Sequence, residues 1–216
     1  MLEIKGVTFS TNNHYNTLQN INLSLDDGEK ALLFASSESG VIELFRLILN
    51  LESAKQGEIY INKKNIQKAN FKDLNVLYIP KEPVFFENKS IEYNLLYFIK
   101  LRVKNKAERI KILENALISL GFDGIRNLNV KNLNKFERLK LAICRASFRK
   151  IDLVLVENVF ESISDKEIEE ALNLLNELIE KNNSAVFIWI ENKELQKHFK
   201  AYKKYTLEYG TLNPMP

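Results

Sequence analysis

The segment from Ala35 to Ile42 has the position and the residue types that decide whether the chain could bind phosphate. It follows the short apolar run Lys30–Phe34, which is typical of a buried parallel strand, and it precedes residues 41–51, whose apolar side chains recur at helical spacing. A tight loop between a strand and a helix is the layout of a phosphate-binding loop, in which backbone N–H groups surround the anion. The chemistry of the segment therefore depends on its individual side chains.

These side chains differ from those that phosphate binding requires. A working loop has the pattern Gly-x-x-x-x-Gly-Lys-Ser/Thr, in which the lysine binds phosphate oxygens and the hydroxyl binds magnesium. Only Gly40 matches the four defining positions, because Val41 replaces the lysine and Ile42 replaces the hydroxyl. Glu38 adds a carboxylate, and two like charges about 4 Å apart repel by roughly 4 kcal/mol at an effective dielectric near 20. We expect ordinary turn residues at Ser36, Ser37 and Ser39.

A second set of candidate residues follows the apolar run Leu153–Val156. Glu157 keeps a carboxylate that could hold a metal ion or its water, but Asn158 cannot accept a proton from an attacking water molecule. The only cysteine is Cys144, and His14 and His198 have no companion cysteines. We therefore predict no catalytic residue, no disulfide and no metal site.

The composition is that of a folded protein with unusually few glycines. The 216 residues include 7 glycines, whereas an average usage of roughly 7% predicts about fifteen. Lysine plus arginine total 31 and aspartate plus glutamate 28, and the two signs alternate along the chain instead of forming a basic stripe. We therefore expect no nucleic-acid binding. The longest apolar runs are too short to span a bilayer, and no signal-peptide apolar region follows Met1. The single cysteine fits a reducing cytosol.

The elements that position these residues alternate between strands and helices. We expect an edge strand starting at Leu2–Ile4, further strands at 21–25, 30–34, 57–61, 153–156 and 185–190, a short strand plus loop over 77–86, and helices at 41–51, 133–148 and 165–181. Residues 90–121 are expected to be mostly helical and to stop at Gly121. Short core strands alternating with helices indicate an α/β domain with a largely parallel sheet, and the helical block at 90–148 interrupts the alternation.

In order and spacing, these elements resemble the ATP-binding subunit of ABC transporters over essentially the whole chain. The resemblance is carried by Asp27-Gly28-Glu29, by Gly57–Asn62, and by Leu133–Ala146 followed by Ile151–Val156; Arg138–Ala146 is similar to the helix after the family's signature motif. It implies a P-loop NTPase-like ABC ATPase fold with a mainly parallel sheet core, an antiparallel β layer and a lateral helical subdomain. It also implies a single domain, 1–216, with a core at about 1–85 and 149–216 and a helical subdomain at about 86–148.

The same resemblance assigns family roles to positions that have lost the matching side chains. Asn158 takes the place of the catalytic glutamate and Glu191 that of the switch histidine. Lys81 takes the place of the glutamine that the family has after the first strand of the subdomain. The adenine-stacking tyrosine falls near Thr11, with Tyr15 or His14 as alternatives. The signature motif is represented by Leu133–Glu137, where Lys135 and Phe136 would place side chains in the gap that two glycines normally leave for the partner's nucleotide. The vestigial nucleotide-binding residues are Ser36, Ser37, Ser39, Gly40, Val41, Ile42 and Glu157, and ATP with magnesium is a cofactor only if weak binding is retained.

The partner that the resemblance implies is an integral membrane protein. In the family, a groove near the glutamine position accepts a short cytoplasmic coupling helix. The corresponding residues here are Lys81, Glu82, Pro83, Phe85, Phe86 and Tyr93. Aromatic and aliphatic anchors suit the recognition of a helix in a groove. The alternative is that Phe85 and Phe86 are buried core residues, since one of two neighbours normally faces inward.

Three functions follow from this reading. The first is a non-hydrolysing scaffold or regulatory subunit, cytoplasmic and peripheral at the inner face of the cell membrane, in a transport or FtsEX-like cell-division complex; the layout is most similar to the FtsE-like or LolD-like subgroup. Such a subunit could form a homodimer or pair with another ABC ATPase. The second is a divergent ATPase with weak ATP binding and slow hydrolysis. The third is a soluble interaction module that has lost its membrane partner.

Overall fold

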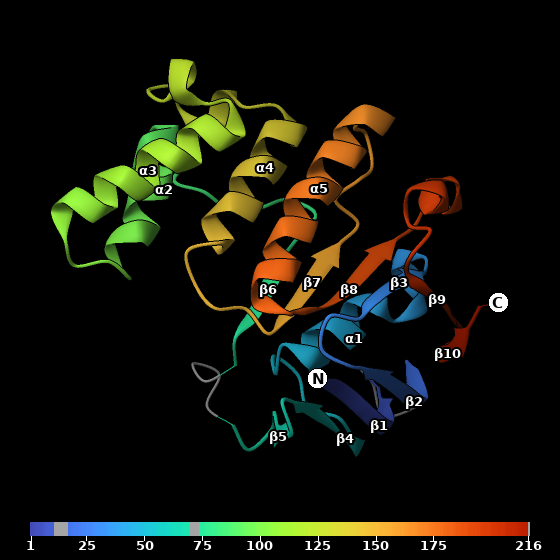
Figure 1. Ribbon diagram of the computed structural model, residues 1–216. Helices are drawn as coiled ribbons and strands as arrows, with labels where there is room; N and C mark the ends of the chain where they lie inside the picture. Colours follow the sequence, from blue (N-terminus) through green and yellow to red (C-terminus); the bar gives the residue numbers. More distant parts are fainter. Residues whose placement is uncertain (11–16, 70–73, 216) are drawn as a thin grey trace. The chain divides into compact units, whose positions relative to one another are not determined.

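The structure, a computed structural model, describes residues 1–10, 17–69 and 74–215 of the chain (Figure 1). It divides into two compact units. One contains residues 1–81, 151–161 and 179–216, and the other contains residues 82–150 and 162–178. The second unit thus includes residues 162–178, which the sequence assigned to the core, because the first four turns of the helix α5 (Asp165–Asn182) cluster with the other helices and not with the strands.

The first unit contains two sheets. The larger one has six strands in the order β10-β9-β3-β8-β7-β6. Neighbours from β9 to β6 run parallel, and β10 is antiparallel to β9. Its strands are β3 (Lys30–Phe34), β6 (Val76–Ile79), β7 (Leu153–Glu157), β8 (Ala185–Ile190), β9 (Lys203–Glu208) and β10 (Thr211–Pro214). All six residues of β8 are buried, as expected for a central strand of a parallel sheet. The predicted α/β class with a mainly parallel sheet is confirmed.

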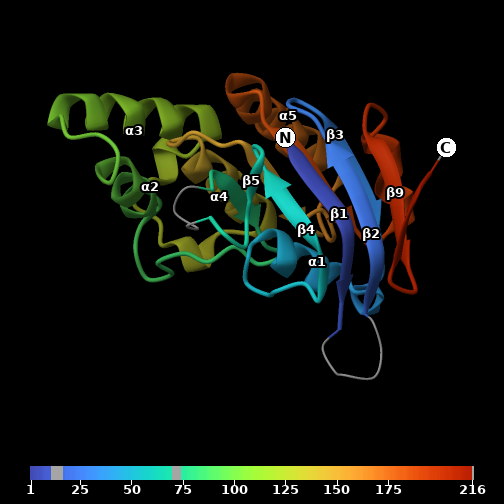
Figure 2. The same ribbon diagram turned by 90° about the horizontal axis from the view of Figure 1, so that it is seen from below.

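The smaller sheet is antiparallel and has the order β2-β1-β4-β5; it faces the viewer in Figure 2. Its strands are β1 (Leu2–Phe9), β2 (Leu18–Leu25), β4 (Gln56–Ile61) and β5 (Lys64–Asn65). The prediction that the chain starts with an edge strand is wrong, because β1 lies between β2 and β4. Gly57 permits this arrangement: its φ is +83°, and a Cβ atom there would lie 2.4 Å from the carbonyl oxygen of Lys5.

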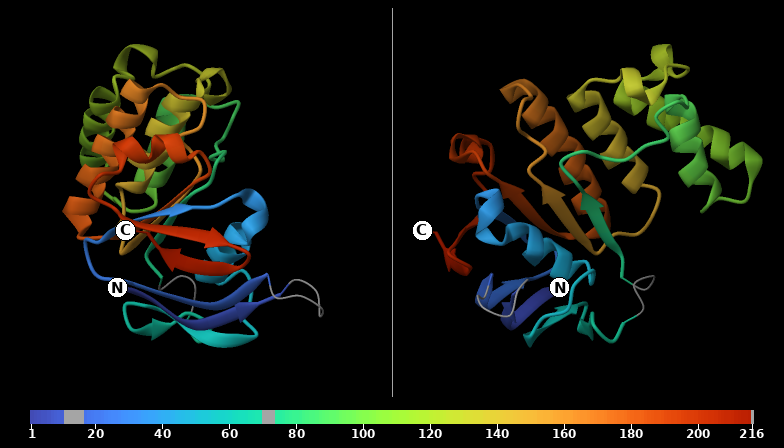
Figure 3. Two further views of the ribbon diagram at one scale, coloured as in Figure 1. Left: turned by 90° about the vertical axis from the view of Figure 1, so that its right-hand side faces the viewer. Right: turned by 180° about the vertical axis from the view of Figure 1, so that it is seen from behind.

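Helix α1 (Val41–Ile48) packs between the two sheets (Figure 3). Its five buried side chains are Val41, Leu44, Phe45, Leu47 and Ile48, which recur at helical spacing and join the core cluster that both sheets share. Phe45 contacts the rings of Phe187 and Trp189 on β8, with centroid distances of 5.6 and 6.3 Å. The phosphate-loop position, at the N-terminus of α1, is therefore held by the core of the first unit.

The second unit is helical. It contains α2 (Ile91–Lys100), α3 (Lys106–Leu120), α4 (Lys135–Ala146) and the start of α5. α3 ends at Gly121 in the left-handed conformation, as predicted. The apolar side chains that recur at helical spacing in α4 and α5 are buried, whereas Leu101 is 62% exposed because α2 ends before it, at Lys100. Among the described residues, no helix is long and apolar enough to cross a membrane.

Candidate functional site

The loop at the N-terminus of α1 is a turn that is closed by its own hydrogen bonds. Ser39 donates its backbone N–H to the carbonyl of Ser36 at 3.0 Å, and its hydroxyl donates to the same oxygen at 2.7 Å. Gly40 has a φ of +94°, and a Cβ atom there would lie 2.8 Å from the carbonyl oxygen of Thr17. The glycine that survives in the phosphate-loop pattern is therefore required by the turn itself.

One backbone N–H group of this loop is already hydrogen-bonded to a carboxylate of the protein. The backbone N–H of Ser37 donates to Oε1 of Glu191 at 3.2 Å. Glu191 follows directly after β8, and the preceding Trp189 donates its indole N–H to the carbonyl of Ala35 at 2.8 Å. These two hydrogen bonds connect the end of β8 to the loop after β3. The side chain at the switch-histidine position places a negative charge beside the loop, and an incoming phosphate would bring further negative charge to it.

The loop borders a pocket of about 860 Å³ within the first unit. Its lining residues are Thr17, Phe34, Ala35, Ser36, Glu38, Ser39, Glu191, Lys193, Leu207, Glu208, Tyr209 and Gly210. The lining therefore includes three carboxylates and one ammonium group. Val41, at the position of the phosphate-binding lysine, is fully buried and does not reach the pocket, and Ile42 is 40% exposed.

The carboxylate that could bind a metal ion is engaged by a tyrosine. The hydroxyl of Tyr78 on β6 donates a hydrogen bond to Glu157 at the end of β7. Burial of Tyr78 and the adjacent Glu157 carboxylate raise the pKa of the phenol well above its usual value, so it remains a donor at neutral pH. Sequence reasoning missed Tyr78. The parallel pairing of β6 with β7, which places Tyr78 opposite Leu155, brings the phenol within reach of Glu157.

Asn158, at the position of the catalytic glutamate, has a structural role. It is buried, with an exposed fraction of 1%, and its φ of +42° is in the left-handed region, which asparagine tolerates better than most residues. Its backbone N–H donates to the carbonyl of Trp189 at 2.8 Å, and its Oδ1 accepts the backbone N–H of Glu191 at 3.2 Å. The side chain thus connects the end of β7 to the end of β8.

These groups do not fit a magnesium–nucleotide complex. Positions 41 and 42 carry neither an ammonium group nor a hydroxyl, the carboxylates of Glu38 and Glu191 lie at the rim of the loop, and Glu157 is bound to Tyr78. Within the described ranges, no group of three or more histidine, cysteine, aspartate or glutamate side chains is placed to hold a metal ion. The predicted adenine-stacking candidates Thr11, His14 and Tyr15 lie outside the described residues.

The signature-motif position forms the start of α4. Asn134 is the N-cap: its side chain accepts the N–H of Glu137 at 2.9 Å, and the Glu137 carboxylate accepts the N–H of Asn134 at 2.9 Å. Lys135 is exposed, but Phe136 is buried, with the ammonium group of Lys140 5.0 Å from its ring. The expectation that Phe136 projects into a nucleotide gap is wrong, because its ring packs inside the helical unit.

The predicted partner residues divide between the two units. Lys81 belongs to the first, where its ammonium group forms an ion pair with Glu161 at 2.8 Å that raises the pKa of the lysine. Glu82, Phe86 and Tyr93 in the second unit are exposed. Pro83 and Phe85 are buried, so they are not available as surface contacts, and of the two neighbouring phenylalanines one faces inward as the alternative held.

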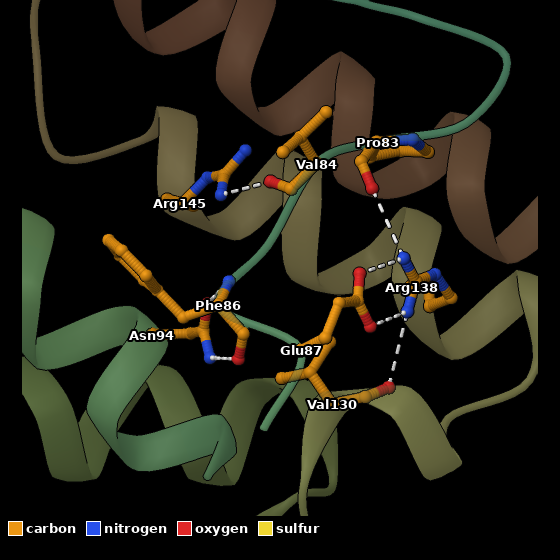
Figure 4. Close-up of polar contacts among 8 residues, drawn as sticks. All are labelled: Pro83, Val84, Phe86, Glu87, Asn94, Val130, Arg138 and Arg145. Carbon is orange, nitrogen blue, oxygen red and sulfur yellow. Dashed lines mark hydrogen bonds and ion pairs between the residues drawn. The ribbon is translucent and has the colours of Figure 1, made fainter. Parts of the chain in front are cut away.

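Polar side chains hold residues 83–87 in place (Figure 4). Arg138 donates to the carbonyl oxygens of Pro83 and Val130, at 3.3 Å each, and binds both carboxylate oxygens of Glu87 at 2.7 and 2.9 Å. Arg145 donates to the carbonyl of Val84 at 2.9 Å. The Arg138 guanidinium lowers the pKa of Glu87, so the pair stays ionised at neutral pH. Arg138 and Arg145 lie 5.1 and 4.7 Å from the buried ring of Phe85.

Val84, which lies within the predicted partner segment, is 77% exposed. Sequence reasoning missed Tyr97, which is 40% exposed. Tyr97 follows Tyr93 by one helical turn of α2, a spacing that puts both rings on one face and that the sequence alone already contained.

Two sheets with a helix between them, a phosphate-loop position at the start of that helix and a separate helical unit define the nucleotide-binding domain of ABC transporters. The model of the ABC transporter family matches residues 18–161, and the chain belongs to this family. It is 24% identical over 165 residues to the sn-glycerol-3-phosphate import ATP-binding protein UgpC of Salmonella typhimurium, covering 76% of this chain and 46% of UgpC. It is 24% identical over 181 residues to the sulfate/thiosulfate import ATP-binding protein CysA of Synechocystis, covering 83% and 51%. The chain spans about half the length of these curated relatives.

Solved structures show the same fold. The ATP-binding cassette MJ0796, in a dimeric post-hydrolysis state bound to ADP and Pi, gives a TM-score of 0.81 at 17% identity and covers 100% of this chain and 99% of its own. CbiO1 from Clostridium perfringens, part of the ABC transporter complex CbiONQ, gives 0.84 at 14% identity, with coverage of 98% and 86%. The fold is therefore that of an ATP-binding cassette, although the side chains at its nucleotide positions differ from those of the family's motifs.

Proposed function

We propose that this chain is a subunit of an ABC-type complex that does not hydrolyse ATP, and that it acts in the cytoplasm as a scaffold or regulatory partner of membrane protein subunits. The observation that carries the proposal is the hydrogen bond from the Ser37 N–H to the Glu191 carboxylate, in a loop where Val41 replaces the cation. A loop that holds its own carboxylate and lacks a lysine repels a triphosphate instead of binding it.

The signature position indicates that pairing with a complete ABC ATPase would not restore an active nucleotide site in a dimer with this chain. In the family, each composite site combines the phosphate loop of one subunit with the signature motif of the other. Here the loop has lost its cation, and the signature position is an Asn134–Glu137 capping box. In a dimer with a complete ABC ATPase, one composite site would therefore lack a working phosphate loop and the other a working signature motif. This favours a scaffold over the less active subunit of a working heterodimer.

We expect no nucleotide binding in the micromolar range. Trp189 is the only tryptophan and its indole binds the loop carbonyl of Ala35, so its fluorescence reports on any ligand that enters the loop. Titration with ATP, with and without magnesium, is expected to give no saturable change below millimolar concentrations, and a fluorescent ATP analogue should agree. A variant carrying Glu38→Gly, Val41→Lys and Ile42→Ser together, with its fold checked by circular dichroism, should bind at least about 100-fold more tightly, since each charge-assisted bond contributes roughly 1.5–3 kcal/mol. Micromolar binding by the wild-type chain would refute the proposal.

A divergent ATPase is the second candidate, and Gly40 favours it. The loop keeps the left-handed turn at Gly40, and Glu157 keeps a carboxylate at the end of β7. The same titration separates the two candidates, because slow hydrolysis requires saturable binding of ATP with magnesium.

A membrane subunit is the expected partner. Affinity purification of the full chain from detergent-solubilised membranes of its own cells should recover a polytopic or bitopic protein, and the exposed residues Phe86 and Tyr93 are the contacts that we expect to matter. A Tyr93→Ala variant should recover less of that protein than a Tyr209→Ala variant, which changes an exposed tyrosine of the first unit. Recovery of soluble proteins only would favour a module that has lost its membrane partner.

A further inference from the structure

Two stretches of the helical unit carry basic residues and no acidic ones. Residues 93–107, which include the end of α2 and the turn after it, contain four lysines or arginines and neither aspartate nor glutamate. Residues 138–151, which include the end of α4, contain five lysines or arginines and again no acidic residue. Both stretches differ from the mixed charges of most of the chain, so any surface that they share is strongly basic.

Contacts within the helical unit place the ends of these two helices side by side. The guanidinium of Arg145, in the last turn of α4, lies 4.7 Å from the centroid of the Phe98 ring, in the last turn of α2. Four residues further along each segment, Arg149 is partly buried and close enough to Arg102 for the two charges to interact. Burial and this like charge both lower the pKa of Arg149. The positive charges of the two stretches therefore gather where α2 and α4 end.

Several of these cations have no carboxylate partner. The guanidinium of Arg145 is partly buried, and its hydrogen bond in the described part of the chain goes to the Val84 carbonyl, which carries no charge. Among the described residues, no hydrogen bond or ion pair involves the exposed side chains of Lys100, Arg102 and Lys104. Two other arginines of the same unit do pair with glutamates. The basic charge at the ends of α2 and α4 is thus available to an external anion.

An exposed apolar side chain stands among these cations. Leu101 is 62% exposed, and its neighbours in sequence on both sides are basic. The turn that presents it is ordered: the backbone N–H of Val103 donates to the carbonyl of Ile99 at 2.9 Å, and Nε of Arg109 donates to the carbonyl of Val103 at 2.5 Å. The exposure of Leu101 is therefore a stable feature of the fold. An apolar side chain surrounded by lysine and arginine is typical of a surface that lies at a membrane interface.

We propose that this surface, formed by residues 100–104 together with Arg145 and Arg149 and called here the basic end, binds the anionic phospholipids of a membrane directly. Its lysines and arginines would contact lipid phosphate groups, and Leu101 would enter the boundary of the acyl chains. The exposed leucine selects a lipid surface over a free polyanion, which offers nothing apolar to it. This lipid contact goes beyond the proposed function, in which a protein partner holds the chain at the membrane.

The proposal is tested by sedimentation of the purified full chain with vesicles that contain no membrane protein. We expect binding to vesicles of phosphatidylcholine mixed with phosphatidylglycerol and none to vesicles of phosphatidylcholine alone. Salt should weaken the binding, because the Debye length falls from about 10 Å at 0.1 M to about 3 Å at 1 M. Soluble glycerol phosphate, which has the same phosphate chemistry without the bilayer, should not release the protein at millimolar concentration.

Two variants of the basic end should weaken this binding. Arg102→Glu should reduce the vesicle affinity at least about tenfold, since each cation close to an anionic bilayer contributes about fivefold and the change reverses one charge. Leu101→Ser should reduce the affinity severalfold, because it removes the apolar contact. Both residues are exposed, so both variants should keep the circular dichroism spectrum and the unfolding midpoint of the wild type.

Matched controls separate the basic end from the net charge and the general stickiness of the chain. Lys55→Glu makes the same reversal of charge at an exposed lysine of the first unit, and Ile118→Ser removes an apolar side chain of α3 that is 64% exposed. Each control should bind vesicles as the wild type does.

Four results would overturn the proposal: no binding to anionic vesicles, equal binding to neutral vesicles, equal losses in the controls and the variants, or release by millimolar glycerol phosphate, which would indicate a site for a soluble anion. The vesicles carry neither nucleotide nor a membrane subunit. Failure here is therefore distinguishable from failure of the proposed function.

Discussion

Replacing Asn158 by glutamate, which restores the family's catalytic residue type, should lower the free energy of unfolding by about 3–5 kcal/mol without producing ATP hydrolysis, because an uncompensated buried charge costs about that much. The position is 1% exposed, and its φ of +42° disfavours a longer side chain than asparagine. The nearby carboxylates of Glu157 and Glu191 add like-charge repulsion. Denaturant unfolding and a phosphate-release assay measure the two outcomes.

Asn158→Gln is the matched control, because it has the same length as glutamate without the charge. The introduced glutamate should have a raised pKa in the folded state, so its ionised form is destabilising. The difference between the two variants should therefore be absent below about pH 4, where both side chains are neutral, and should grow as the pH rises. Equal stability of the two variants at pH 7 would contradict a buried position for residue 158.

Replacing Arg138 by alanine should lower the free energy of unfolding by about 2–3 kcal/mol, since the carbonyls of Pro83 and Val130 lose a charged donor and each such hydrogen bond contributes roughly 1.5 kcal/mol. Glu87 is partly exposed and can be rehydrated, so the carbonyls account for most of the effect. Hydrogen exchange should accelerate at the Phe86 amide, whose bond to Asn94 depends on the same segment. Arg102→Ala removes an exposed arginine side chain that makes no hydrogen bond in the described part of the chain, and it should change stability by less than about 0.5 kcal/mol.

The Arg138–Glu87 pair also gives a defined pH dependence. The pKa of Glu87 is lowered in the folded state, so the pair stabilises the fold above the ordinary glutamate pKa of about 4.3 and loses that contribution as the pH falls through the lowered value. The difference in stability between the wild type and Arg138→Ala should narrow over that acidic range. If this difference in stability stays constant down to the lowest pH at which the protein is folded, the hydrogen bonds to the two carbonyls alone account for it.

Most of the fold follows from local patterns. The strand at Lys30–Phe34 and the strand at Ala185–Ile190 have the bounds that their apolar runs predict, because a strand buried on both faces needs an uninterrupted run. The place of β1 inside its sheet did not follow, since strand order depends on pairing between β1 and residues 48 to 59 positions further along the chain. The hairpin of β9 and β10 was also missed, because the partly exposed β9 carries a mixed polar and apolar pattern.

At the candidate site, the sequence by itself determined which chemical groups are missing. A valine cannot carry a charge, an isoleucine cannot bind magnesium and an asparagine cannot act as a base, wherever these residues lie. What took the place of those groups was decided by the tertiary structure. The Glu191 carboxylate at the Ser37 N–H, the Tyr78 hydroxyl on Glu157, and the outward Phe86 beside the inward Phe85 each depend on contacts between segments that pair or pack across the chain. Composition and motif spacing carry no distances, so only the folded chain can show which donor meets which acceptor.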